Sequence, residues 1–170
     1  SWYTPINGIL YPANPPGTAV AKGPSAWDPS AVSAYANVVI VYDFYDNTLY
    51  HTSFDDNGAA IQITVASDAL NNAYWYRTYR QFVFGHDFEA ALDVVGHEYT
   101  HAVIDAVVAS QNGGVTLGQN GEARALEEAY ADIIGSLIEG KSGPGEWLVG
   151  EDIGCDAPSG TTGCAFRNIA

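Results

Sequence analysis

Basic residues, cysteines and long apolar runs are all scarce in this sequence. Only 6 Lys and Arg stand against 20 Asp and Glu, which gives a formal net charge of -14 over 170 residues. A chain this acidic repels phosphate groups, which argues against nucleic acid and against an anionic membrane surface as partners. Acidity of this degree also suggests that some carboxylates lie beside bound cations. No run of about 18 apolar residues occurs, so no segment is predicted to span a membrane.

The two cysteines, Cys155 and Cys164, enclose a short segment rich in Gly, Ser and Thr. A turn-rich ring of this kind is easily closed by a disulfide, which would contribute on the order of 2 to 3 kcal/mol. Disulfides persist in oxidising compartments, so we expect a secreted, extracellular protein. The alternative is two free thiols in a surface loop. Residues 1–5 lack the features of a signal peptide, so any leader is expected to have been removed or never present.

The order of patterns along the chain predicts an α+β fold. Residues 1–26 are rich in Pro and Gly and predict an irregular arm with one short strand at 6–11. In 27–170, which is long enough for one domain, apolar periodicity predicts the following elements. Helices are expected at 29–46, 88–109 and 122–139, and strands at 60–66 and 79–84. Asp28 and Asn120 are expected to cap the first and third helices.

The stretch 97–101 reads H-E-x-x-H and lies inside the second predicted helix. Two histidines four residues apart share one helix face, so His97 and His101 can reach a single cation. Neutral imidazole suits zinc, and a catalytic zinc keeps one position open for water. Glu98 is placed to take a proton from that water and later deliver it to a leaving amine. Two histidines and a glutamate in an apolar core are costly unless something satisfies them, and the alternative is that hydrogen bonds alone do so.

The third predicted helix offers the remaining donors of a zinc site. Glu128 and Asp132 lie four apart on one face, so if Glu128 binds zinc, Asp132 can accept the free N–H of a histidine. Glu127 could do the same for the other histidine, although an adjacent residue points about 100° away. The alternative is a solvated acidic face. The apolar pairs at 133–134 and 137–138 favour an inward-facing one.

Segments 93–105 and 128–135 together resemble the thermolysin family of zinc metalloendopeptidases, and the resemblance extends over roughly 27–170. It implies a zincin-type catalytic domain in which a small mixed or antiparallel sheet packs on long helices. These helices would carry the H-E-x-x-H motif and the third zinc ligand, and the family's helical C-terminal domain would be absent from this chain. The resemblance assigns one catalytic zinc to His97, His101 and Glu128, the general base to Glu98, and an orienting role to Asp132.

The resemblance also covers segment 71–75, which is similar to the family's Asn-Asn-Ala-Phe-Trp. In the family the second Asn and the Ala hold the substrate backbone, which implies substrate-binding roles for Asn72 and Ala73, and we group Trp75 with them. The preceding strand, 60–66, is expected to offer its edge to an extended peptide. The alternative for the two asparagines is an ordinary turn.

Four acids match family positions that bind calcium near the zinc: Asp93, Glu139, Glu146 and Glu151. Oxygen-only coordination of this kind suits a hard cation, so the resemblance implies one or two structural calcium ions. Glu146 stands where the family usually has aspartate. The alternative is a set of scattered surface acids.

Two groups that stabilise the family's transition state have no counterpart here. The family places a tyrosine after the motif helix and a histidine in its C-terminal domain, but this chain has no tyrosine between Tyr99 and Tyr130. Loss of such a donor costs a factor of about 100 to 1,000, so we expect weak catalysis from this chain by itself. Three explanations are open. The chain is one half of an enzyme completed by a separate C-terminal chain, or a fragment, or a minimal protease that uses His86, Tyr74 or Arg124 instead.

The expected function is therefore a secreted zinc-dependent endopeptidase acting on peptides or proteins, in which Glu98 assists the attack of zinc-bound water. The alternative is a metal-bound but weak or inactive peptide-binding module that needs a second chain for activity. A third interpretation, an adhesion module stabilised by calcium, leaves the combined histidine and carboxylate pattern unexplained.

Overall fold

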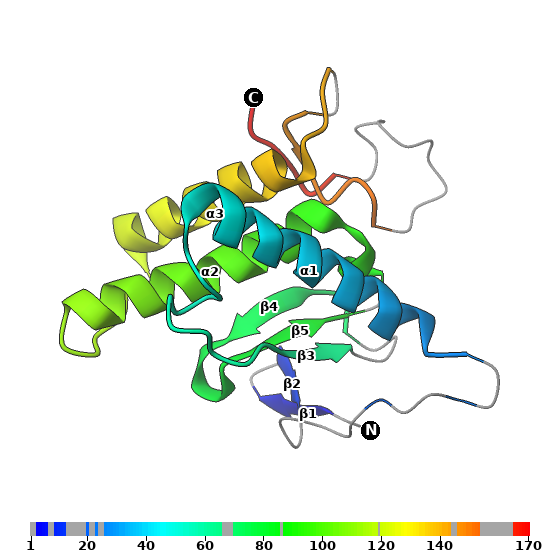
Figure 1. Ribbon diagram of the computed structural model, residues 1–170, viewed down its shortest axis with the longest axis horizontal. Helices are drawn as coiled ribbons and strands as arrows, with labels where there is room; N and C mark the ends of the chain where they lie inside the picture. Colours follow the sequence, from blue (N-terminus) through cyan, green and yellow to red (C-terminus); the bar gives the residue numbers. More distant parts are fainter. Residues whose placement is uncertain are drawn as a thin grey trace.

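Three long helices dominate the computed structural model, which describes residues 3–6, 9–12, 20, 23, 26–65, 70–85, 87–118, 120–143, 146–153 and 165–170. They are α1 (Pro29–Leu49), α2 (Leu92–Gln111) and α3 (Gly121–Glu139). Helix α2 packs along α3, and α1 crosses in front of α2 (Figure 1). None of the helices in the described ranges is long and apolar enough to cross a bilayer.

A three-stranded sheet covers the side of α2 that faces away from α3 (Figure 1). Its strands are β3 (Gln62–Val65), β4 (Ala73–Tyr76) and β5 (Gln81–Phe84), in the order β3-β5-β4. The central strand β5 runs parallel to β3 and antiparallel to β4. The sheet is therefore mixed, and the α+β class is confirmed. Two short 3-10 turns, η1 (Arg77–Tyr79) and η2 (Phe88–Ala90), join the strands to each other and to α2.

Two further pairs of strands lie outside this sheet. β1 (Tyr3–Ile6) and β2 (Ile9–Pro12) form an antiparallel hairpin, so the predicted single strand at 6–11 is wrong. Most of 13–26 lies outside the described residues, so the irregular arm as a whole stays a prediction. The prolines were misleading because a two-stranded ribbon has free edges, where a missing N–H is tolerated. β6 (Leu148–Val149) pairs with β7 (Arg167–Asn168), which brings the last residues of the chain beside α3. The two cysteines lie outside the described residues.

The helix ends follow from local chemistry. The Asp28 side chain accepts a hydrogen bond from the Ala31 N–H at 3.0 Å, which confirms the predicted cap of α1. Helix α3 ends at Gly140, which adopts φ 66°. Asn120 occupies the predicted N-cap position of α3, but its side chain makes no capping hydrogen bond. Helix α2 begins later than expected because 88–90 form the tighter turn η2.

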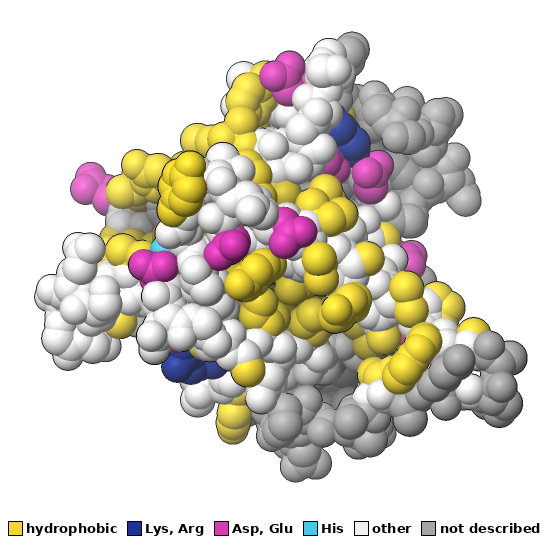
Figure 2. Space-filling view, in the orientation of Figure 1, with side chains coloured by type: hydrophobic (Ala, Val, Ile, Leu, Met, Phe, Trp, Pro, Cys, Tyr) yellow, Lys and Arg dark blue, Asp and Glu magenta, His cyan; other side chains and the backbone are white. Residues whose placement is uncertain are grey.

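An aromatic core joins the three helices to the sheet. Phe82 of β5 stacks on Tyr99 of α2 with ring centroids 5.5 Å apart, and Tyr45 of α1 packs on the same ring at 5.1 Å. All three side chains are buried. The surface is different: on the face shown in Figure 2, hydrophobic side chains gather over α1, and acidic groups far outnumber basic ones. Burial of Tyr99 fixes the rotation of α2, so the opposite side of its H-E-x-x-H turn faces α3.

Candidate metal centre

Helices α2 and α3 touch backbone to backbone at two glycines. A Cβ on Gly135 would lie 2.4 Å from the carbonyl oxygen of Asp93, and a Cβ on Gly96 would lie 3.1 Å from the Cα of Gly135. Side chains larger than hydrogen would force the helices apart at this point. The close approach places the H-E-x-x-H turn of α2 directly against 127–132 of α3.

The two histidines turn their Nε2 atoms toward each other, 3.0 Å apart. Their other ring nitrogens face carboxylates of α3: His97 Nδ1 lies 2.8 Å from Asp132 Oδ1, and His101 Nδ1 lies 2.8 Å from Glu127 Oε1. A nitrogen beside a carboxylate carries the proton, so in a neutral ring Nε2 is left with its lone pair. In that neutral form two lone pairs face each other and repel, and either a proton or a metal cation held between the rings removes the repulsion.

Glu128 supplies a third donor at the same point. Its carboxylate oxygens lie 3.3 Å from His97 Nε2 and 3.5 Å from His101 Nε2. One ligand atom from each of these residues falls within 4.8 Å of the others. Two imidazole nitrogens and one carboxylate leave an open position, which is the donor set of a catalytic zinc. The side chain of Glu128 is 30% exposed, so this position opens toward solvent.

The net charge of the side chains around the histidines also suits a divalent cation. Glu98, Glu127, Glu128 and Asp132 contribute four negative charges. Arg124 pairs with Glu127 and Glu128, and Arg167 pairs with Asp132, which contributes two positive charges. With neutral imidazoles the net charge is therefore -2. Zinc fits this site in donor type, donor number and charge.

The pKa values of two site residues reflect this excess of negative charge. Burial lowers the pKa of His97, but contacts with Asp132 and Glu128 outweigh burial and raise it to about 9. The His97 contact likewise outweighs burial at Glu128 and holds the pKa of that carboxyl at about 2. The surroundings of His97 therefore favour a positive charge at the place where the donor atoms meet.

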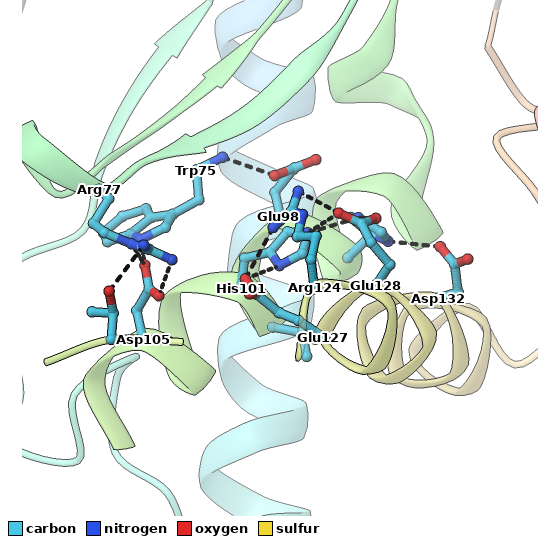
Figure 3. Close-up of polar contacts among 12 residues, drawn as sticks. Trp75, Arg77, Glu98, His101, Asp105, Arg124, Glu127, Glu128 and Asp132 are labelled. Atoms are coloured by element: carbon cyan, nitrogen blue, oxygen red, sulfur yellow. Dashed lines mark hydrogen bonds and ion pairs between the residues drawn. The ribbon is translucent and has the colours of Figure 1, made fainter. Parts of the chain in front are cut away.

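Glu98 points from α2 toward the sheet (Figure 3). Its Oε2 accepts a hydrogen bond from the backbone N–H of Trp75 in β4 at 2.8 Å. A pocket of about 670 Å³ opens between β4 and the first turns of α3. Both histidines, Glu98 and Glu128 line it. The donor set, a carboxylate base and a strand edge thus share one pocket.

Residues 7–105 match the family described as thermolysin metallopeptidase, catalytic domain. The chain belongs to this family. The match includes both histidines and stops before α3, so the third donor, Glu128, lies beyond it.

Relatives support the same family. The chain is 35% identical over 163 residues to bacillolysin from Brevibacillus brevis, with 91% of this chain and 28% of the relative covered. Neutral protease B from Bacillus subtilis (strain 168) is 37% identical over 146 residues, covering 81% of this chain and 25% of that protein. The chain spans less than a third of the length of these curated relatives. Among solved structures, the precursor of protealysin, a metalloproteinase from Serratia proteamaculans, matches with a TM-score of 0.65 and 28% identity, covering 81% of this chain and 45% of that one.

The segment similar to the thermolysin family's substrate-binding stretch lines the pocket. Asn72, Ala73 and Trp75 all face it, and they belong to β4 or directly precede it. The expectation that 60–66 offers the peptide-binding edge is wrong. Strand β3 occupies the far edge of the sheet, beyond β5, and the pocket is lined by β4 instead. Which of two edge strands faces α2 depends on the order of strands in the sheet, which alternation along one strand does not reveal.

Three arginines of the pocket wall were missed or undervalued by sequence reasoning. Arg77 and Arg167 were not considered, and Arg124 was considered only as a candidate oxyanion donor together with Tyr74, which also lines the pocket. His86, the third candidate, lies outside the described residues. The signal that could have found them is scarcity: three of the six basic residues of this chain line one pocket.

A second acidic cluster lies on the other side of the α2–α3 crossing. Asp93, Glu139 and Glu151 each offer an oxygen within 4.8 Å of the others, whereas Glu146 is exposed and stands outside this group. Lys141 contacts Glu139 at 3.0 Å and Glu151 at 2.6 Å. One ammonium does not neutralise three carboxylates.

The buried oxygens of this cluster also lack partners. Burial and the Asp93 carboxylate raise the pKa of Glu139 to about 7. The Oε2 atoms of Glu139 and Glu151 are buried without a hydrogen-bond partner among the described residues. The cluster therefore fits a hard cation in addition to Lys141.

Proposed function

We propose that this chain is the part of a zinc endopeptidase that carries the metal ligands and the general base. The observation that carries the proposal is the convergence of His97, His101 and Glu128 beside Glu98 in a pocket bordered by the edge of β4. A zinc ion held by these three donors would polarise the peptide carbonyl and lower the pKa of water.

Strand β4 offers a place for the substrate backbone. The Trp75 N–H points away from β5 and toward α2, because it donates to Glu98. Ala73 lies two residues earlier on the same strand, so its backbone groups face the same edge. An extended peptide would bind there through main-chain hydrogen bonds, which do not depend on its sequence. Peptides and proteins are therefore the proposed substrates.

Glu98 would act as the base. Its Oε2 is held by the Trp75 N–H, which leaves Oε1 to accept a proton from the attacking water. The same oxygen would return the proton to the amine nitrogen as the peptide bond breaks. Asp132 and Glu127 would keep the proton of each histidine on Nδ1, so that each Nε2 stays available to the metal.

The decisive variant is Glu98→Gln, which keeps the size of the side chain and removes its basicity. We expect about one zinc per chain, as in the wild type, and peptide hydrolysis at least about 100-fold slower. Glu122→Gln, at an exposed position on the first turn of α3, is the matched control and should cleave normally. A zinc-loaded Glu98→Gln protein with full peptidase activity would contradict the proposal.

The relatives are several times longer than this chain, so the assay should use the protein in the form in which it is produced, without further truncation. A separate C-terminal chain that completes the pocket stays a prediction. Intact mass under native and denaturing conditions would test it, since a second polypeptide released only on denaturation is the expected result. We also infer a secreted protein, in which Cys155 and Cys164 can be oxidised.

We further propose that the cluster of Asp93, Glu139 and Glu151 binds one structural calcium ion. The support is the excess of buried negative charge left after Lys141 is counted. Glu146, which the resemblance also assigns to calcium, is not included because it stands apart from this cluster.

A further inference from the structure

Helix α2 carries a second buried carboxylate on the face that bears Glu98. Asp105 follows Glu98 after about two helical turns, so both side chains project toward the same strand. The two carboxylates hold opposite ends of one residue of β4 (Figure 3). Glu98 accepts from the backbone N–H of Trp75 at 2.8 Å, and Asp105 accepts from the indole Nε1–H of Trp75 at 2.9 Å.

Arg77 completes the arrangement around Asp105. Its Nε–H donates to Asp105 Oδ2 at 2.5 Å, and a second N–H donates to Asp105 Oδ1, so the contact is two-pronged. A further N–H of Arg77 donates to Thr116 Oγ1 at 3.0 Å, in the loop that leaves α2. Asp105 is only 6% exposed. The Arg77 guanidinium, which belongs to η1, therefore contacts both α2 and the loop after α2.

The ion pair of Arg77 and Asp105 is partly buried, and such a pair is poor evidence for stability, because removing charges from water costs about as much as the pair returns. What the ion pair contributes is a fixed geometry. The planar guanidinium fixes both the distance and the direction of the carboxylate that it meets. In this pocket the Asp105 carboxylate holds β4 through the indole of Trp75. The backbone N–H of the same residue contacts Glu98, the proposed base. A shift of β4 would alter the distance between Glu98 and any peptide bound along the strand.

We propose that Asp105 and Arg77 are positioning residues that hold the β4 edge in register with Glu98. They act through Trp75, not by contact with the metal donors. The proposal rests on the proposed endopeptidase function for its kinetic consequence, and its structural consequence at Trp75 can be measured independently.

The test uses Asp105→Asn and Arg77→Gln in the zinc-loaded whole protein. Arg80→Gln is the matched control, because Arg80 lies in the same segment and forms an exposed ion pair with Asp55, at 3.2 Å, outside the pocket. Three quantities are measured: zinc content, hydrogen exchange at the Trp75 backbone amide and indole N–H, and kcat and KM for a peptide substrate.

Both variants should keep zinc and exchange the Trp75 hydrogens at least about tenfold faster than the control. The value of kcat/KM should fall on the order of 10- to 100-fold, since small misplacements of reacting groups cost about this much. Arg77→Lys should recover only part of the loss, because an ammonium cannot make the two-pronged contact. If Asp105→Asn does not fold, Arg77→Gln gives the answer, because it leaves the bond between Asp105 and the indole in place.

Exchange and kinetics indistinguishable from Arg80→Gln would overturn the proposal. If the wild type itself cleaves no peptide, the proposed function fails, and the exchange data then decide the positioning role alone. Faster exchange at Trp75 would support that role, and unchanged exchange would overturn it.

Discussion

At the scale of single residues, the proposed metal donors depend on partners outside the donor group itself. Glu127 is 1% exposed and hydrogen-bonds to His101 Nδ1, while Asp132 Oδ1 lies 2.8 Å from His97 Nδ1. Burial raises the pKa of Glu127, but the hydrogen bond to His101 together with the charges of His101, Arg124 and Arg77 outweighs burial and leaves the pKa below its usual value. Glu127 is therefore an anion that fixes the proton of His101 away from the metal side.

Replacing that anion should weaken zinc binding. In Glu127→Ala the His101 ring loses its orientation and its tautomer, and outer carboxylates of this kind are worth about 10- to 100-fold in metal affinity. Competition with a chelator measures the effect, with Glu122→Gln as the surface control. Zinc affinity equal to that of the wild type would show that His101 needs no partner.

At the scale of elements, the position of the site depends on how closely α2 and α3 approach. The crossing at Gly96 and Gly135 is tight enough that the carbonyl of Asp93 fills the space of a Gly135 side chain. The same crossing lies between the proposed metal donors on one side and the acidic cluster on the other. A change in the spacing of the two helices would therefore reach both.

Gly135→Ala tests this coupling. The added methyl group must push the helices apart, which should cost about 1 to 3 kcal/mol and lower the Tm by roughly 2 to 12 °C. Zinc affinity should fall with it, since Glu128 moves away from the histidines. Gly118→Ala is the control, because no atom lies within 4 Å of its added Cβ, and its Tm should stay within a few degrees of the wild type. Equal Tm values for both variants would contradict the tight crossing.

At the scale of the whole molecule, buried tyrosines set an upper limit on the pH at which the fold is stable. Burial raises the pKa of Tyr45 to about 12, despite its hydrogen bond to Thr100, and burial also raises the pKa of Tyr99. Both rings belong to the aromatic core that joins α1, α2 and the sheet. The folded state therefore requires these phenols to be neutral.

Stability should accordingly fall in alkali. Below pH about 10 both states keep the phenol protons, so the contribution is fully present. Above that pH the unfolded chain releases protons that the folded chain retains, and the free energy of unfolding decreases as the pH rises toward about 12. Denaturant unfolding between pH 8 and 11.5, roughly, measures the slope. Tyr45→Phe should reduce it, and an unchanged slope in this variant would show that Tyr45 ionises freely.

The acidic cluster makes a second prediction for the whole molecule. Calcium bound only by the folded state should raise its stability by about 2.7 kcal/mol at 100 times the Kd, which thermal unfolding with and without added calcium would detect. Glu139→Gln should remove most of this gain, and Glu146→Gln should leave it intact because Glu146 stands outside the cluster. A loss in Glu146→Gln equal to that in Glu139→Gln would restore Glu146 to the site.

The sequence by itself determined the features that depend on spacing within one helix. His97 and His101 share a face because they are four residues apart, and the same holds for Glu128 and Asp132. The cap at Asp28 and the mixed class of the fold followed from equally local patterns. These features hold because hydrogen bonding along a helix repeats regardless of what packs around it.

The tertiary structure alone decided which segments meet. In the folded structure β4 is the strand that lies beside α2. Arg77 contacts Asp105 and Thr116, and Arg167, near the end of the given sequence, contacts Asp132. Glu146 lies on the surface. Contacts between distant segments depend on strand order and on the glycine crossing of α2 and α3, and both are set by packing of the whole core, not by any local pattern.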